Sequence, residues 1–288
     1  MSFYKPVEWL AERLGQEGLV VVDARYALND SEAGSRAYAE GHIPGAYYLS
    51  LSHDLSGPKR PGGEGGRHPL PEPAALAAVL GRIGIDRSTT VIAYDDQGGA
   101  MASRLRWLLQ WTGHDADVYV LEGGFAAWLA AGYEVSKETP AEAAGVVYEP
   151  QVQEGMLVSR AEVLERLGQP GTVLIDSREA PRYRGEVEPL DPAAGHIPGA
   201  INRFWAEGKR ADGSWKSPTE QAERFAGISQ DDEIIVYCGS GVTATPNVFA
   251  LQDAGFRNVK LYAGSWSDWS SDKGNPVAVG DQQETRSV

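Results

Sequence analysis

The stretch Glu233–Ala244 reads Glu-Ile-Ile-Val-Tyr-Cys-Gly-Ser-Gly-Val-Thr-Ala. Its apolar run predicts a strand that is buried on both faces, as the strands of parallel sheets are. The chain then passes through a short glycine-rich loop into a predicted helix, so Cys238 stands where backbone N–H groups can converge on one sulfur. Such a site favours a thiolate, and it favours a persulfide anion for the same reason.

Cys238 is the only cysteine in the 288 residues, so the chain cannot form an internal disulfide. Any redox step must therefore use the thiol of a partner or a small molecule. A lone cysteine is more often a small buried hydrophobe than a nucleophile. Its position at the end of a strand, in front of a Gly-x-Gly loop, nevertheless favours a functional role.

The composition predicts a soluble globular protein with two ordinary domains, since 42% of the residues are hydrophobic and no long apolar run is present. The net charge of −14 argues against binding to nucleic acid or to an acidic membrane, because both need a basic surface. The N-terminus lacks a signal-peptide pattern, so we expect a cytoplasmic location. The sequence contains no metal-binding or dinucleotide-binding motif, and we expect neither a metal nor a cofactor.

The two halves of the chain carry the same four signals in the same order. These are an apolar strand ending in Asp-x-Arg, the run Gly-His-Ile-Pro-Gly-Ala, a second apolar strand, and a Gly-x-aromatic-x-x-Trp motif. They lie at Leu19–Arg25 and Thr172–Arg178, Gly41–Ala46 and Gly195–Ala200, Thr90–Asp95 and Glu233–Cys238, and Leu121–Trp128 and Tyr262–Trp269. This repetition predicts a duplicated domain.

The repeats also predict how the chain is divided. We expect a first domain over residues 1–140, a linker over 141–155 and a second domain over 156–288. The first half is the longer one, and the Gly/Pro-rich run Ser56–Gly66 is the obvious insertion, which we expect to be a surface loop. Strands alternate with helical patterns in both halves, so we expect an α/β fold in which each domain has a mostly parallel central sheet with helices on both faces.

These motifs together resemble the rhodanese superfamily: Asp-x-Arg, Gly-His-Ile-Pro-Gly-Ala, a strand entering Cys-Gly-x-Gly-Val-Thr, and a closing Gly-x-Trp-x-x-Trp. The resemblance covers nearly the whole chain, in the tandem arrangement of the two-domain sulfurtransferases. It implies that the first domain, with Asp95 in the place of the cysteine, is catalytically inactive. Within the family, this loop is typical of 3-mercaptopyruvate sulfurtransferases, whereas members that use thiosulfate usually carry Cys-Arg-Lys-Gly-Val-Thr.

That difference has a physical reason. Thiosulfate is a dianion, and two fixed cations beside the sulfur would stabilise its sulfite leaving group. Here the two loop positions are the neutral Gly239 and Ser240. Mercaptopyruvate has one carboxylate and one keto group, so it needs a single cationic anchor and hydrogen bonds to the departing enolate.

The resemblance also implies the substrate-binding residues. Arg182 lies in a run that resembles the Arg-Tyr/Phe-x-Gly substrate site of the family, and a guanidinium binds a carboxylate through two parallel hydrogen bonds. Mercaptopyruvate enzymes generally have a second arginine some nine residues further on. Here Leu190 and Asp191 stand near that place, and Arg203 is a possible substitute. We expect the backbone N–H groups of the loop to surround the outer sulfur, with Gly239, Gly241, Val242 and Thr243 as the residues involved.

The family's mercaptopyruvate members also have a proposed Ser-His-Asp relay near the leaving group. The matching positions here are Ser240, His42 and Asp30. A structural role in the turn explains His42 equally well, because His196 occurs in the same motif of the second half. For Asp23–Arg25 and Asp176–Arg178 we expect ion pairs that fasten the strand ends.

We therefore expect a sulfurtransferase in which Cys238 takes the sulfur from the donor as a persulfide and passes it to an acceptor. The acceptor would be a thiol, such as a thioredoxin or a small thiol, or cyanide in vitro. A thiosulfate sulfurtransferase and a non-enzymatic sulfur carrier are the alternatives. A Cys-x5-Arg phosphatase is disfavoured because Ala244 stands where its arginine would be.

Overall fold

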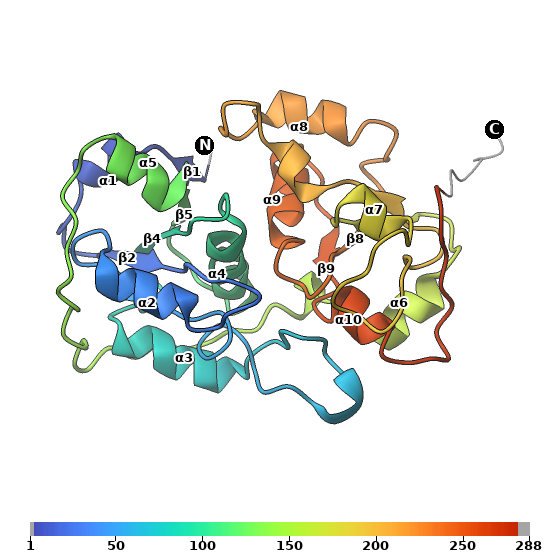
Figure 1. Ribbon diagram of the computed structural model, residues 1–288, viewed down its shortest axis with the longest axis horizontal. Coiled ribbons are helices and arrows are strands. Elements are labelled where there is room, and N and C mark those ends of the chain that lie inside the picture. The colour runs from blue at the N-terminus through green and yellow to red at the C-terminus, as the bar shows by residue number, and fades with distance from the viewer. Residues whose placement is uncertain (1–2, 282–288) are drawn as a thin grey trace. The chain divides into compact units, whose positions relative to one another are not determined.

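The computed structural model describes residues 3–281 and divides them into two units (Figure 1). The first unit contains the chain up to Gly57, Leu70–Glu154 and Ala211–Trp215; the second contains Pro58–Pro69, Gly155–Arg210 and the chain from Lys216 onward. Each unit therefore includes one short segment from the other half of the sequence. We expected the chain to divide once, at a linker over 141–155, without any segment of one half belonging to the other domain.

The first unit is built on a five-stranded parallel sheet in the order β1-β5-β4-β2-β3. The strands are β1 (Tyr4–Lys5), β2 (Leu19–Asp23), β3 (Tyr47–Tyr48), β4 (Thr90–Tyr94) and β5 (Val118–Leu121). The helices of this unit are α1 (Val7–Ala11), α2 (Ala33–Glu40), α3 (Pro73–Arg82), α4 (Ala100–Trp111) and α5 (Gly124–Ala130).

The second unit is built on a four-stranded parallel sheet in the order β7-β6-β8-β9. The strands are β6 (Thr172–Asp176), β7 (Ile201–Asn202), β8 (Glu233–Tyr237) and β9 (Val259–Leu261). The helices are α6 (Arg160–Arg166), α7 (Ala180–Tyr183), α8 (Pro218–Arg224), α9 (Thr245–Asp253) and α10 (Ser265–Trp269), with short 3-10 turns η1 (Pro61–Gly63), η2 (Glu154–Met156) and η3 (Trp205–Gly208) in or beside this unit. Both sheets are thus parallel and flanked by helices, which confirms the expected α/β fold.

The central strands lie in the core of their units. From Ile234 to Tyr237, every residue of β8 is fully buried, and β4 is equally inaccessible from Val91 to Tyr94. A continuous apolar run suits such strands because both faces of a parallel sheet are covered. Trp266 and Trp269 are also fully buried, so the closing motif packs in the core of the second unit.

The Asp-x-Arg motif fastens the end of a strand in the same way in both units. The Arg25 guanidinium binds the carboxylate of Asp23 and donates to the carbonyl oxygen of Gly41 at 2.7 Å. In the second unit, Arg178 repeats both contacts with Asp176 and with Gly195, the latter at 2.6 Å. Burial opposes the charge of Arg178, but its contacts with Asp176 outweigh that effect and raise its pKa. The expected structural role of these pairs is confirmed.

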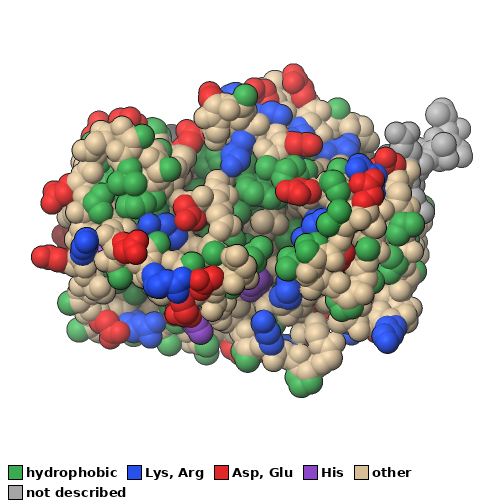
Figure 2. Space-filling view, viewed as in Figure 1, with side chains coloured by type: hydrophobic (Ala, Val, Ile, Leu, Met, Phe, Trp, Pro, Cys, Tyr) green, Lys and Arg blue, Asp and Glu red, His purple; other side chains and the backbone are tan. Residues whose placement is uncertain are grey.

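Acidic and basic side chains are intermixed on the face drawn in Figure 2. Within residues 3–281, none of the helices has the length and apolar character that a membrane crossing requires.

The Arg25–Asp23 pair gives a test of this packing. Both side chains are buried, with 6% and 0% of their surface exposed, so the variant Arg25→Met leaves an unpaired buried carboxylate. We expect the free energy of unfolding to fall by about 3–5 kcal/mol. The matched variant Arg36→Met removes an exposed ion pair with Asp30 and should leave the urea midpoint unchanged. Equal midpoints for the two variants would contradict a structural role for the buried pair.

Candidate active site

Cys238 follows β8 directly and is buried, with 1% of its surface exposed. The amide of Gly241 donates a hydrogen bond to its Sγ atom at 3.2 Å. The backbone amide of Cys238 itself donates to Oγ of Ser265 at 3.1 Å. A backbone N–H directed at the sulfur stabilises negative charge on it, which is the arrangement expected for a thiolate nucleophile.

The start of α10 holds the cysteine loop in place. Ser265 has a φ of 55°, the only positive value at a non-glycine residue within the described chain. Such a conformation costs of order 1–3 kcal/mol and is found where surrounding contacts enforce it. The next two amides, of Trp266 and Ser267, donate to the carbonyl oxygens of Cys238 and Gly239 at 3.0 and 2.9 Å. The sequence did not predict that this motif supports the cysteine loop.

Two glycines of the loop are required for different reasons. Gly241 has a φ of 74°, and a Cβ atom there would overlap the carbonyl oxygen of Ala263. A Cβ atom on Gly239 would instead lie 3.0 Å from Nη2 of Arg67 and 3.4 Å from Nη1 of Arg182. The missing side chain at Gly239 therefore makes room for two guanidinium groups next to the cysteine.

These two arginines are paired with two buried carboxylates. Arg182 binds both oxygens of Glu188 at 2.7 and 2.9 Å and one oxygen of Asp191 at 3.2 Å. Arg67 forms an ion pair with the other oxygen of Asp191. Glu188 also contacts Arg178 at 3.1 Å, so the network continues into the Asp-x-Arg motif of this unit.

A histidine lies beside the loop hydroxyl, but it is not the one expected. Nδ1 of His68 is 2.8 Å from Oγ of Ser240, and both residues are buried. His68 and Arg67 belong to the segment Pro58–Pro69, which is part of the second unit. Sequence reasoning assigned most of this segment to a surface loop. An available signal was that the insertion Ser56–Gly66 occurs in one half only and is followed directly by two basic residues.

Asp268 fastens this segment to the second unit. One of its carboxylate oxygens accepts a hydrogen bond from the amide of Gly65 at 2.9 Å, and the other accepts one from the hydroxyl of Tyr262 at 2.6 Å. A Cβ atom on Gly66 would overlap the carbonyl oxygen of Gly264. This close approach fixes the backbone immediately before Arg67 and His68.

His42 and Asp30, the other two members of the expected relay, have polar contacts within the first unit. The ring of His42 stacks on Tyr38, and its nitrogens lie 2.8 and 3.1 Å from the carbonyl oxygens of Tyr38 and Glu138. Asp30 is exposed and pairs with Arg36. Both residues belong to the first unit, whereas Ser240 belongs to the second. His196 stacks on Tyr183 in the same way, so the turn-forming alternative explains both histidines.

The remaining predicted residues follow the cysteine or lie at the edge of the sheet. Val242 is buried, and its carbonyl oxygen accepts the amide of Thr245 at 3.1 Å where α9 begins, directly after Thr243 and Ala244. Arg203 donates to the neighbouring carbonyl oxygen of Asn202 at 2.9 Å. No contact of Arg203 with the cysteine loop is recorded in the part of the chain that the structure describes.

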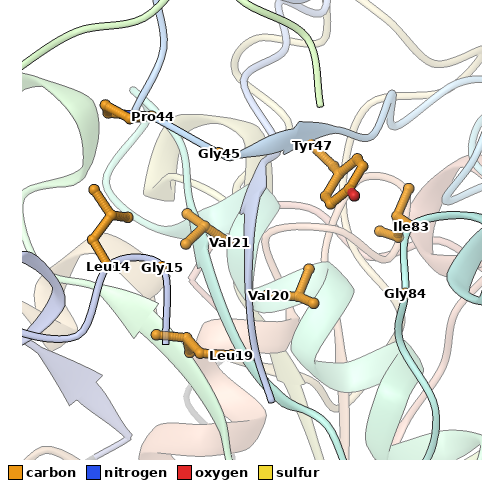
Figure 3. Close-up of a pocket in the computed structure, with 10 residues that line it drawn as sticks. All are labelled: Leu14, Gly15, Leu19, Val20, Val21, Pro44, Gly45, Tyr47, Ile83 and Gly84. Atoms are coloured by element: carbon orange, nitrogen blue, oxygen red, sulfur yellow. The ribbon is translucent and has the colours of Figure 1, made fainter. Parts of the chain in front are cut away.

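The first unit contains a pocket of about 450 Å³, which differs in chemistry from the cysteine site. Figure 3 shows its lining of aliphatic side chains, such as Val21 and Ile83, with the phenol of Tyr47. The lining contains no thiol, and the phenol of Tyr47 is its one polar side chain. The described residues also include no group of three or more His, Cys, Asp or Glu side chains that could hold a metal ion.

Comparison with known proteins gives consistent matches. The rhodanese-like domain profile matches residues 6–131 and 159–272. A Pseudomonas aeruginosa protein named "Probable 3-mercaptopyruvate sulfurtransferase" is 46% identical over 94% of this chain and 96% of its own. A "Thiosulfate sulfurtransferase" of the same species is 34% identical over 94% of both chains. The crystal structure of SseA from Escherichia coli, described as a 3-mercaptopyruvate sulfotransferase, matches with a TM-score of 0.80 and 32% identity, covering 92% of this chain and 99% of that one.

The two loop glycines give a matched pair of substitutions. Gly241→Ala combines a left-handed backbone, which costs roughly 1–2 kcal/mol by itself, with a backbone overlap, so we expect a clear loss of unfolding free energy. Gly239→Ala meets only the ends of two flexible side chains and should leave stability nearly unchanged. Urea unfolding of both variants measures the difference. A Gly239→Ala variant as unstable as Gly241→Ala would show that the loop is constrained in another way.

Proposed function

The chain belongs to the rhodanese-like domain family, which confirms the resemblance of its motifs, and we propose that it is a sulfurtransferase that moves a sulfane sulfur from 3-mercaptopyruvate to a thiol acceptor. The observation that carries this proposal is the position of the only cysteine. Cys238 ends a central strand, receives an amide hydrogen bond on its sulfur, and is followed by a glycine that two guanidinium groups approach.

In the first half-reaction, the Cys238 thiolate attacks the sulfur of mercaptopyruvate. A sulfur–sulfur bond forms, the carbon–sulfur bond breaks, and its electron pair leaves with pyruvate as the enolate. The proton of the donor thiol is released from the new persulfide, and the enolate takes up one proton to become pyruvate. The step is balanced without an external oxidant or reductant.

Arg182 is the proposed anchor for the carboxylate of the donor. Its Nη1 atom faces the loop at Gly239, while its Nε and Nη2 atoms bind Glu188. The guanidinium is therefore held from one side and presents the other side to the donor. Holding the donor in line with the sulfur converts an encounter in solution into a step with fixed geometry.

His68 and Ser240 are the proposed route for the proton. Their contact at 2.8 Å connects an imidazole, which can gain or lose a proton near neutral pH, to a hydroxyl two residues after the nucleophile. This pair takes the place of the Ser240, His42 and Asp30 relay that the resemblance implied. Sulfite, the product from thiosulfate, leaves without needing a proton.

The loop of the first unit that corresponds to the Cys238 loop provides an argument for the proposed persulfide site. Asp95 replaces the cysteine in the first repeat, and its buried carboxylate accepts hydrogen bonds of 2.7–3.0 Å from four amides, those of Gln97 and Gly99 in the loop and of Met101 and Ala102 in the first turn of α4. The loop that follows the central strand can thus surround an anion. We infer that amides of the Cys238 loop, among them those of the expected Gly239, Gly241, Val242 and Thr243, stabilise the outer sulfur of the persulfide.

In the second half-reaction, an acceptor thiolate attacks the outer sulfur and releases the Cys238 thiolate. A reduced thioredoxin or a small thiol is the proposed acceptor, and cyanide replaces it in an assay. The sequence of steps requires a donor and a thiol acceptor, and it involves no cofactor or metal.

Thiosulfate is the second candidate donor. Although the loop itself lacks cations, Arg67 and Arg182 stand beside Gly239, so two guanidinium groups are present near the sulfur. A relative named "Thiosulfate sulfurtransferase" at 34% identity favours the same donor. A carrier that presents its persulfide only to a dedicated protein partner is the non-enzymatic alternative.

Steady-state sulfur transfer to cyanide, with mercaptopyruvate and thiosulfate measured in parallel, tests the proposal. We expect wild type to prefer mercaptopyruvate and Cys238→Ser to be inactive with both. Arg182→Ala should lower kcat/KM for mercaptopyruvate roughly 10- to 100-fold, because a charged hydrogen bond is lost.

The matched control is Arg184→Ala, which removes the next arginine on the same segment; it pairs with the exposed Glu186. We expect this variant to behave as wild type. A wild-type preference for thiosulfate would overturn the donor assignment, and inactivity with both donors would favour the carrier.

Replacement of His68 tests the proton route. His68→Gln should lower kcat with mercaptopyruvate about 10²-fold or more, while transfer from thiosulfate changes much less. His42→Gln should reduce stability and leave the ratio of the two activities unchanged, because His42 supports a turn. If His68→Gln impaired both donors equally, His68 would have no role specific to the leaving group.

A further inference from the structure

The arginines beside the cysteine are accompanied by an equal number of carboxylates. Arg67 and Arg182 are partly accessible, with 23% and 18% of their side chains exposed, whereas Asp191 and Glu188 are almost fully buried at 1% and 3%. Buried carboxylates are costly and would repel an anionic donor. Sulfur transfer alone does not explain their presence at this place.

Asp191 joins the two arginines. One of its carboxylate oxygens pairs with Arg67 and the other accepts from Arg182 at 3.2 Å. Its own backbone amide donates to Glu188 at 3.2 Å, which fixes its position. The same carboxylate thereby holds Arg67, from the segment Pro58–Pro69, and Arg182, from α7.

Each arginine keeps one terminal nitrogen directed at the cysteine loop. Nη2 of Arg67 and Nη1 of Arg182 are the atoms that come nearest to the Cβ position of Gly239, at 3.0 and 3.4 Å. No hydrogen bond of these two nitrogens to another described residue is recorded. Two N–H donors on one side of a small space match the two oxygens of a carboxylate.

We propose that Arg67 binds the carboxylate of the sulfur donor together with Arg182, and that Asp191 positions both arginines and makes the site prefer singly charged over doubly charged donors. This inference rests on the proposed function and assigns the donor specificity of the enzyme to Arg67 and Asp191. Arg67 then supplies the second cation, and Asp191, at the place where the family generally has an arginine, holds it.

The preference for a singly charged over a doubly charged donor follows from Coulomb's law. Removal of one negative charge stabilises a bound dianion about twice as much as a bound monoanion, whatever the local dielectric constant is. Asp191 therefore lowers the affinity for thiosulfate more than the affinity for mercaptopyruvate. The Asp191 carboxylate weakens the binding of both donors, and it increases the difference between their binding free energies.

Substitutions at Arg67 and at Asp191 test the two parts of the proposal. Arg67→Ala should raise KM for mercaptopyruvate roughly 10- to 100-fold with a smaller change in kcat, and it should weaken binding of pyruvate, measured by calorimetry. Arg67→Lys, which keeps the charge but not the paired donors, should be intermediate. Asp191→Asn should raise the ratio of kcat/KM for thiosulfate to that for mercaptopyruvate about tenfold.

The controls are Arg60→Ala, in the same segment and paired with the exposed Glu64, and Glu186→Gln, which removes an exposed carboxylate close to α7. Both should behave as wild type. If Arg67→Ala and Arg67→Lys bind pyruvate as Arg60→Ala does, Arg67 is not a ligand of the donor. If Asp191→Asn reduces both donors by the same factor, its role is structural and the charge preference is wrong.

Failure of the proposed function has a different signature. In that case wild type would transfer sulfur from neither donor, whatever the behaviour of the Arg67 variants in the pyruvate titration.

Discussion

In each unit, the central strand that enters the site is followed by a buried acceptor group, and backbone amides of the next turn donate hydrogen bonds to it. In the first unit the group is the carboxylate of Asp95, which four backbone amides surround. In the second unit it is the sulfur of Cys238, which accepts a hydrogen bond from the amide of Gly241. Parallel strands place such loops at a common edge of the sheet, so a fold that stabilises a carboxylate in one repeat can stabilise a persulfide in the other.

The sequence predicted the repeated architecture well because the relevant signals are local. Uninterrupted apolar runs such as Ile234–Tyr237 identify central strands, and the four repeated motifs establish duplication without any knowledge of contacts. Asp23 and Arg25 were interpretable for the same reason, since an ion pair two residues apart at the end of a strand needs no distant partner. Cys238 was identified by its position at the end of such a strand.

The surroundings of the cysteine could not be derived in this way. His68 and Arg67 are about 170 residues away from Ser240 and Gly239 along the chain, and only tertiary packing brings them together. The sequence led instead to His42. This histidine recurs in the second repeat as His196, and both support a turn of the backbone. The meaning of Gly239 was hidden too, because the space left by a missing side chain has no signature until its neighbours are known.

The exchange of short segments between the units has a consequence for how such a gene can evolve. Once Pro58–Pro69 had become part of the second unit, deletion of the first repeat would also have removed Arg67 and His68. The first repeat has Asp95 at the position that matches Cys238, yet its part of the chain supplies two residues that lie beside the cysteine loop. The same exchange runs in the other direction through Ala211–Trp215, where Trp215 stacks on Tyr4 and its amide donates to Glu122. Each unit therefore contains a segment that the other half of the chain supplies. A single truncation that removes one half would remove part of the remaining unit as well.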